Sequence, residues 1–210
     1  MISSAIIAQL IESVRLKSIA SAARQIVAIA GPPGTGKSTL AWHVANELGA
    51  DMCVIVPMDG FHLANSIIAE TPLRDRKGAI DTFDAGGYIS LLRRLKARNE
   101  PVVYAPSYRR GLEEPIAASI AVPQAAQIVL TEGNYLLVQE PPWNGAGAYF
   151  DETWFVETPR ALRVERLIAR HETFGMTRED AISWTHTVDE INADVISATK
   201  SHADRIIHST

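Results

Sequence analysis

The residues with the clearest chemical potential form the run GPPGTGKST at residues 31–39. It fits the pattern G-x-x-x-x-G-K-[ST], in which glycines allow backbone N–H groups to surround a chain of phosphates. Lys37 would neutralise the β- and γ-phosphates, and the Ser38 hydroxyl would ligate Mg²⁺. The run therefore predicts a nucleoside-triphosphate site formed by Gly31, Pro32, Pro33, Gly34, Thr35, Gly36, Lys37, Ser38 and Thr39.

Such a loop needs a strand before it and a helix after it, because the helix N-terminus supplies free N–H groups to the phosphates. Residues 25–30, QIVAIA, are typical of a buried parallel strand. Leu40, Val44 and Leu48 then recur every four residues, as one helical face requires, and Gly49 ends the helix. The alternative is a glycine-rich turn that carries Lys-Ser by chance, and it would have to match four fixed positions and both flanks.

Two carboxylates follow predicted strands at the edge where the phosphates should lie. Asp59 comes after the second predicted strand, where it could take a proton from an acceptor hydroxyl, although an aspartate beside glycine is as often a turn or cap residue. Glu132 ends a later apolar strand and could serve the metal directly or through water; its alternative is a loop glutamate. His62 lies three residues after Asp59, and we expect it to contact substrate rather than act as the base.

Three arginines share one face of a predicted helix that starts with Thr158 as its cap and Pro159 at its first position. The spacings of three and four place Arg163, Arg166 and Arg170 on that face. A solvated charged face is one interpretation. The other is a lid over the nucleotide, with Arg166 stabilising the transferring phosphoryl group and Arg163 and Arg170 binding ATP.

The rest of the chain predicts one α/β domain over residues 1–210, in which strands alternate with helices. An amphipathic helix is expected over 4–18, packed on the core or binding a partner, and another from Asp84 to about Arg98. Residues 58–83 lack periodicity, which favours a functional connection. Strands are expected at 25–30, 52–56, 102–105, 127–131, 153–156 and 205–207, with an irregular proline-rich piece at 106–125.

Composition excludes several classes of partner. The net charge of −4 argues against nucleic acid, whereas local groups of arginines suit a small anionic ligand. The single cysteine, Cys53, lies in an apolar run and is expected to be a buried, inert thiol. With no positive residue before Arg15 and no long apolar stretch, we expect neither a signal peptide nor a membrane span, and a cytoplasmic protein.

Five segments in order carry a resemblance to a known family: GPPGTGKST, PMDGFHL, RKGAIDTFD, VVYAPSYRR and VLTEGNYLL. Together they resemble the uridine kinase, phosphoribulokinase and bacterial pantothenate kinase group. Within it they look most like the subgroup labelled nucleoside or nucleotide kinase-like, or fructose transport system kinase. The resemblance covers about residues 24–208. It implies the three-layer α/β/α fold of phosphate-loop NTPases, with a mainly parallel five-stranded sheet and a helical lid near residues 158–178.

The resemblance also implies roles for particular residues. Asp59 matches the group's catalytic base, and Asp81 matches its contact to acceptor hydroxyls. Tyr104 and Arg109 match residues that line the acceptor site. Uridine kinases carry a Phe-Tyr pair after the base and a histidine in the mid-chain motif, where this chain has Phe61-His62 and Tyr108-Arg109. A uridine site is therefore not expected, and Arg109 with its neighbour Arg110 would suit a carboxylate or phosphate on the acceptor.

These residues together predict an ATP- and Mg²⁺-dependent kinase that phosphorylates a hydroxyl of a small metabolite such as a sugar or nucleoside. Two alternatives stay open: a nucleotide kinase whose acceptor is a phosphate, and a regulatory ATPase or nucleotide-dependent switch. A homodimer is also left open. The acceptor's identity does not follow from the sequence.

Overall fold

The computed structural model describes residues 2–210. Its central sheet contains five parallel strands in the order β2-β5-β1-β6-β7. Their bounds are β1 Gln25–Ala30, β2 Cys53–Ile55, β5 Ile128–Gly133, β6 Glu152–Glu157 and β7 Arg205–His208. Every residue of β1 and β5 is buried, which explains why these strands appear as continuous apolar runs. The predicted α/β fold with a parallel five-stranded sheet is confirmed.

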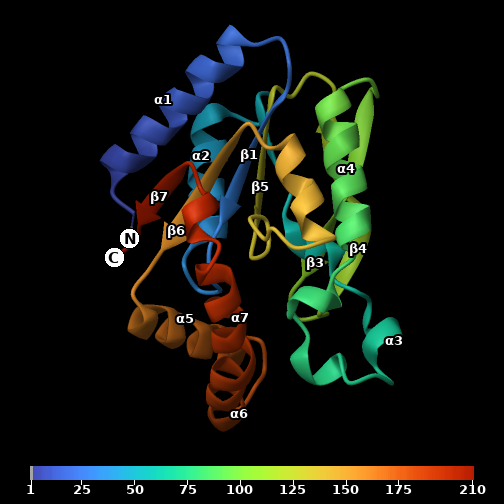
Figure 1. Cartoon of the computed structure of the whole chain (residues 1–210), viewed down its shortest axis with the longest axis vertical. Helices are drawn as coiled ribbons and strands as arrows, with labels where there is room; N and C mark the ends of the chain where they lie inside the picture. Colours follow the sequence, from blue (N-terminus) through green and yellow to red (C-terminus); the bar gives the residue numbers. More distant parts are fainter. Residues whose placement is uncertain (1) are drawn as a thin grey trace.

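Helices cover both faces of this sheet (Figure 1). Helices α1 (Ser4–Ala20) and α2 (Lys37–Leu48) pack on one face through a cluster that includes Leu10, Val14, Leu40 and Val44. Helix α4 (Ala85–Ala97) packs on the other face through a cluster that includes Tyr88 and Leu92. The helices expected at 4–18 and 84–98 are confirmed, and the Asp84 side chain accepts from Gly87 N–H at 2.8 Å as the α4 cap.

The remaining helices gather at the carboxyl ends of the strands, low in Figure 1. They are α3 (Asn65–Ile68), α5 (Arg160–Thr173), α6 (Arg178–Trp184) and α7 (Glu190–Ser197), and a π-helical turn, Thr185–Asp189, separates the last two. Helix α5 begins one residue later than expected, because Pro159 has extended backbone (φ −50°, ψ 136°). The Thr158 hydroxyl does not cap this helix but donates to Thr35 O at 3.1 Å. None of the helices within residues 2–210 is long and apolar enough to cross a membrane.

A two-stranded antiparallel ribbon stands apart from the main sheet. Strand β3 (Val102–Arg109) pairs with β4 (Glu114–Pro123). The strand expected at 102–105 is therefore confirmed but continues to Arg109, and the proline-rich piece at 106–125 contains a second strand that was not expected. Prolines argued against a strand, but both β3 and β4 are edge strands, where a missing N–H is tolerated. The ribbon carries its tip, residues 109–114, toward the carboxyl end of the sheet.

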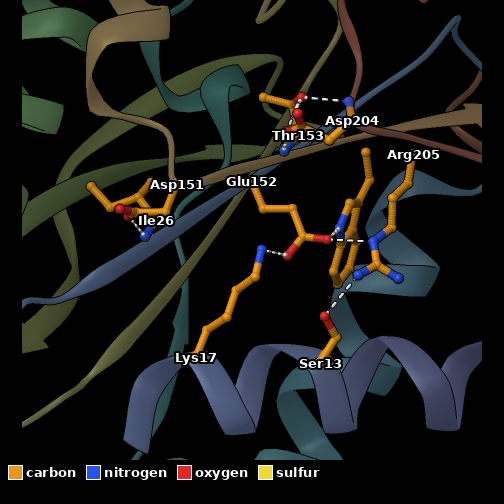
Figure 2. A network of polar contacts seen from close by, with 9 residues as sticks. Ser13, Lys17, Ile26, Asp151, Glu152, Thr153, Asp204 and Arg205 are labelled. Atoms are coloured by element: carbon orange, nitrogen blue, oxygen red, sulfur yellow. Dashed lines mark hydrogen bonds and ion pairs between the residues drawn. The ribbon is translucent and has the colours of Figure 1, made fainter. Parts of the chain in front are cut away.

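A buried carboxylate, that of Glu152, links α1 to strands β6 and β7 of the sheet (Figure 2). Glu152 of β6 accepts from Lys17 Nζ at 2.7 Å and from the Trp154 indole at 2.9 Å, and it pairs with Arg205. Arg205 in turn donates to Ser13 Oγ at 2.8 Å. Burial alone would raise the pKa of Glu152, but these hydrogen bonds and nearby positive charges lower it below its ordinary value.

We expect Glu152→Gln to reduce the free energy of unfolding by about 1–3 kcal/mol at neutral pH, because charge-assisted hydrogen bonds are lost. Since the folded-state pKa is lowered, the carboxylate's contribution is present above its ordinary pKa of 4.5 and is lost as pH falls through the folded value. Urea unfolding at pH 7 and at stepwise lower pH measures this. The difference from wild type should shrink on acidification, whereas the exposed control Glu47→Gln should show little difference throughout.

Candidate active site

A cavity of about 470 Å³ lies at the carboxyl ends of the strands, between the loop before α2 and the tip of the ribbon. Five parts of the chain meet there. The first turn of α2 contributes Lys37 and Ser38, the segment after β2 contributes Asp59 and His62, and β5 contributes Glu132. Helix α5 contributes Arg166 and Arg170, and the β3–β4 ribbon contributes Tyr108 and Arg110. Residues from distant parts of the chain therefore face a single space.

The loop before α2 has the backbone that a phosphate chain requires. Gly34 and Gly36 adopt φ values of 79° and 92°, which side-chain-bearing residues rarely adopt. A Cβ at Gly34 would also lie 2.9 Å from Arg163 O, so α5 packs directly on the loop. Because Gly36 precedes the first turn of α2, the free N–H groups of that turn lie beside the cavity.

The Lys37 ammonium lies across this loop. Its Nζ donates to Gly31 O at 2.7 Å, to Pro32 O at 3.0 Å and to Asn134 Oδ1 at 3.0 Å. Burial lowers its pKa to about 8, although Glu132 and Asp59 favour its charged form. Asn134 was not among the residues predicted from sequence, since an asparagine after a strand carries no signal that distinguishes it from a turn residue.

Ser38 and Glu132 present oxygen atoms to the same corner. Ser38 Oγ donates to Glu132 Oε1 at 3.0 Å, and the charges of Asp59, Lys37 and Arg110 act on Glu132. Burial and the Asp59 carboxylate raise the pKa of Glu132, which Lys37 opposes. Hydroxyl and carboxylate oxygens are hard donors of the kind that Mg²⁺ prefers. A cation would also offset the electrostatic repulsion between the carboxylates of Asp59 and Glu132. The donor chemistry at this corner therefore fits a magnesium ion.

Asp59 lies on a single 3-10 turn, Met58–Phe61, directly after β2. This turn packs on the ribbon so closely that a Cβ at Gly60 would lie 2.4 Å from Pro106 O. Arg110 reaches Asp59 from the ribbon tip, with Nη2 3.4 Å from Oδ2. His62 packs against the rings of Phe83 and Tyr108, with centroids 4.0 and 4.5 Å away, and burial lowers its pKa.

The arginines of α5 are held against the loop rather than spread over a solvated face. Arg163 is buried, pairs with Glu190 at 3.0 Å and donates to Pro33 O at 3.4 Å. Arg166 donates to Gly34 O at 3.4 Å. The Nε of Arg170 is buried and has no hydrogen-bond partner among the described residues. Burial and the charge of Arg110 lower the pKa of Arg170.

The structure does not bring all predicted acceptor residues into the cavity. Asp81 pairs with Arg76 and does not line it, and Tyr104 is 56% exposed on β3, away from the ribbon tip. Arg109 is exposed, whereas the adjacent Tyr108 and Arg110 face the cavity. The segment that carries the sequence motif does line the cavity, but which of its side chains face inward depends on a ribbon that the sequence did not predict. Gly31, Pro32, Thr35 and Arg163 support the loop without lining the cavity.

Comparisons with known proteins agree with this geometry. A family model described as "ATPase family associated with various cellular activities (AAA)" matches residues 27–80, which include the loop and Asp59. The Schizosaccharomyces pombe protein "Putative uridine kinase C227.14" is 35% identical over 181 residues, covering 80% of this chain and 76% of that protein. A pantothenate kinase of Chelativorans sp. is 28% identical, over 82% of this chain and 58% of that protein.

A solved structure is similar over nearly the whole chain. The "putative fructose transport system kinase from Silicibacter sp. TM1040" superposes with a TM-score of 0.86 at 35% identity, covering 95% of this chain and 98% of that one. Together, the phosphate loop, the neighbouring carboxylates and these relatives lead to one conclusion. The chain belongs to a family of P-loop kinases whose members carry names such as uridine kinase and fructose transport system kinase, and which are ATP-dependent enzymes that phosphorylate small metabolites.

Proposed function

We propose that this enzyme transfers the γ-phosphoryl group of ATP to a hydroxyl of a small metabolite, with Mg²⁺ as cofactor. The observation that carries the proposal is that Lys37, the Ser38–Glu132 pair and Asp59 line one cavity. That cavity extends beyond Asp59 to His62, Tyr108 and Arg110, which leaves room for an acceptor.

The phosphate half of the cavity uses the loop and α5. Backbone N–H groups of the loop and the Lys37 ammonium bind the phosphates. Ser38 and Glu132 would hold Mg²⁺, which when bound offsets charge on the transferring group. Arg166 and Arg170 stabilise the transferring phosphoryl group through their positive charge. Residues 158–178, which include both arginines, therefore act as a lid over the nucleotide.

The acceptor half uses Asp59 as a general base. The acceptor oxygen forms a bond to the γ-phosphorus, the bond from that phosphorus to the bridging oxygen of ADP breaks, and the acceptor proton passes to Asp59. His62 and Tyr108 form an aromatic wall that orients the acceptor. Tyr108 and Arg110 take the place that the sequence motif suggested for Tyr104 and Arg109.

A screen of hydroxylated metabolites for ADP release, with mass spectrometry of the product, tests the proposal. We expect at least one sugar, nucleoside or hydroxy acid to raise ADP formation above the rate in water and to gain one phosphoryl group in a magnesium-dependent reaction. Phosphorylation of a phosphate group instead of a hydroxyl would indicate a nucleotide kinase. ADP release that no acceptor raises would indicate a nucleotide-dependent switch.

A further inference from the structure

The guanidinium groups of two arginines line the cavity that also contains Asp59. Arg110 comes from the ribbon tip and Arg170 from α5. Arg110 is 3.4 Å from the Asp59 carboxylate, whereas the buried Nε of Arg170 has no partner among residues 2–210. The two arginines are close enough for Arg110 to disfavour the charge on Arg170. Two like charges that lie close together in one cavity favour an anion that binds both.

The cations that line the cavity are more numerous than its carboxylates. Its positive residues are Lys37, Arg74, Lys77, Arg110, Arg166 and Arg170, and its carboxylates are Asp59, Glu113, Glu132 and Asp189. Lys37 and Arg166 contact the phosphate loop. Arg110 and Lys77 instead flank the Tyr108 ring at 5.9 and 5.4 Å, on the acceptor side. No ion pair joins Lys77 to a carboxylate in the described part of the chain.

The Arg110 guanidinium pairs with the Asp59 carboxylate, which the acceptor hydroxyl needs as its base. If its guanidinium stays on Asp59, an acceptor hydroxyl has to compete for the same oxygen atoms. The ribbon tip itself is braced, because Glu113 accepts from the Tyr108 hydroxyl and from Gly111 N–H, each at 2.8 Å. The Arg110 side chain is 39% exposed, so it can leave Asp59 without movement of the backbone.

We infer that Arg110 masks Asp59 until an acceptor that carries a carboxylate or phosphate draws its guanidinium away. This inference rests on the proposed kinase function and narrows its substrate class to hydroxylated anions. A guanidinium pairs with a carboxylate or phosphate through two parallel hydrogen bonds, which a neutral sugar cannot offer. Arg110 is therefore a specificity-determining residue that couples recognition of the anion to release of the base, and it also protects ATP from water.

The first test measures ATP hydrolysis without an acceptor. We expect Arg110→Gln to raise the slow reaction with water by roughly tenfold, since Asp59 is then unmasked. The double variant Arg110→Gln/Asp59→Asn should lose that gain. The matched control, Arg109→Gln, changes the adjacent arginine that does not line the cavity, and its rate should equal that of wild type. A rate in Arg110→Gln that equals the control would overturn the masking.

The second test uses paired sugar acceptors in which one member carries an anionic group in place of a neutral one: glucuronate with glucose, and ribose 5-phosphate with ribose. Wild type should favour the anionic member of at least one pair by roughly tenfold or more in kcat/KM, and Arg110→Gln should lose that preference. The pair that responds distinguishes a carboxylate from a phosphate. An equal or greater rate with the neutral members overturns the inference but leaves the kinase function intact. Absence of ATP binding and ADP release with every compound would instead reject the proposed function.

Discussion

Lys37→Ala is expected to lower kcat/KM for ATP by roughly 10²- to 10³-fold or more, the scale for removal of a charge-stabilising donor from a transition state. The ammonium is hydrogen-bonded to the Gly31 and Pro32 carbonyls of the phosphate loop, where its charge would meet that of the phosphates. Initial rates of ADP formation at saturating magnesium measure the effect.

Lys37 is buried, so loss of activity has to be separated from loss of structure. Lys37→Met keeps most of the apolar part of the side chain in its buried position. It removes the charge and the hydrogen bonds to Gly31 and Pro32. Both variants should show cooperative thermal unfolding and low activity. A folded Lys37→Met enzyme with wild-type turnover would contradict the assignment of this loop as the nucleotide site.

Asp59→Asn should lower acceptor-dependent turnover by roughly 10²-fold or more while it leaves affinity for a non-hydrolysable ATP analogue within a few-fold. The reason is that a general base acts on the acceptor, whereas the triphosphate is held by the loop and Lys37. Calorimetry and steady-state kinetics on the same preparation measure both quantities.

A matched variant, Asp75→Asn, removes an exposed carboxylate of the same segment that does not line the cavity, and it should retain turnover. Parallel loss of nucleotide affinity and turnover in Asp59→Asn would mean that Asp59 acts through the metal or the fold instead of the acceptor.

The parts of the site that could be predicted from sequence are those in which one local pattern determines both position and role. The phosphate loop is such a case, because glycines, Lys37 and Ser38 are consecutive and flanked by a strand and a helix. The positions of Asp59 and Glu132 beside the loop also followed from the sequence, since Asp59 comes shortly after β2 and Glu132 lies near the end of β5, and the carboxyl ends of parallel strands lie at the same edge of the sheet.

Other features depend on tertiary structure that no short pattern determines. Arg110 enters the cavity and Arg109 does not, which follows from the course of the ribbon and its packing on Gly60. Arg24 is another example. It is 1% exposed, and its guanidinium donates to the carbonyls of Leu95, Pro123 and Ala126, yet a single arginine before a strand gives no such signal.

The separation of the β3–β4 ribbon from the main sheet has a consequence for how such an enzyme can change. Among the described residues, neither strand of the ribbon pairs with a strand of the main sheet. We therefore expect that the ribbon tip, residues 109–114, can be exchanged for that of a relative without loss of the strand pairing in the main sheet. The turn that bears Asp59 packs directly on the ribbon, because Gly60 lies against Pro106. We therefore expect an exchanged tip to lie close to the proposed base.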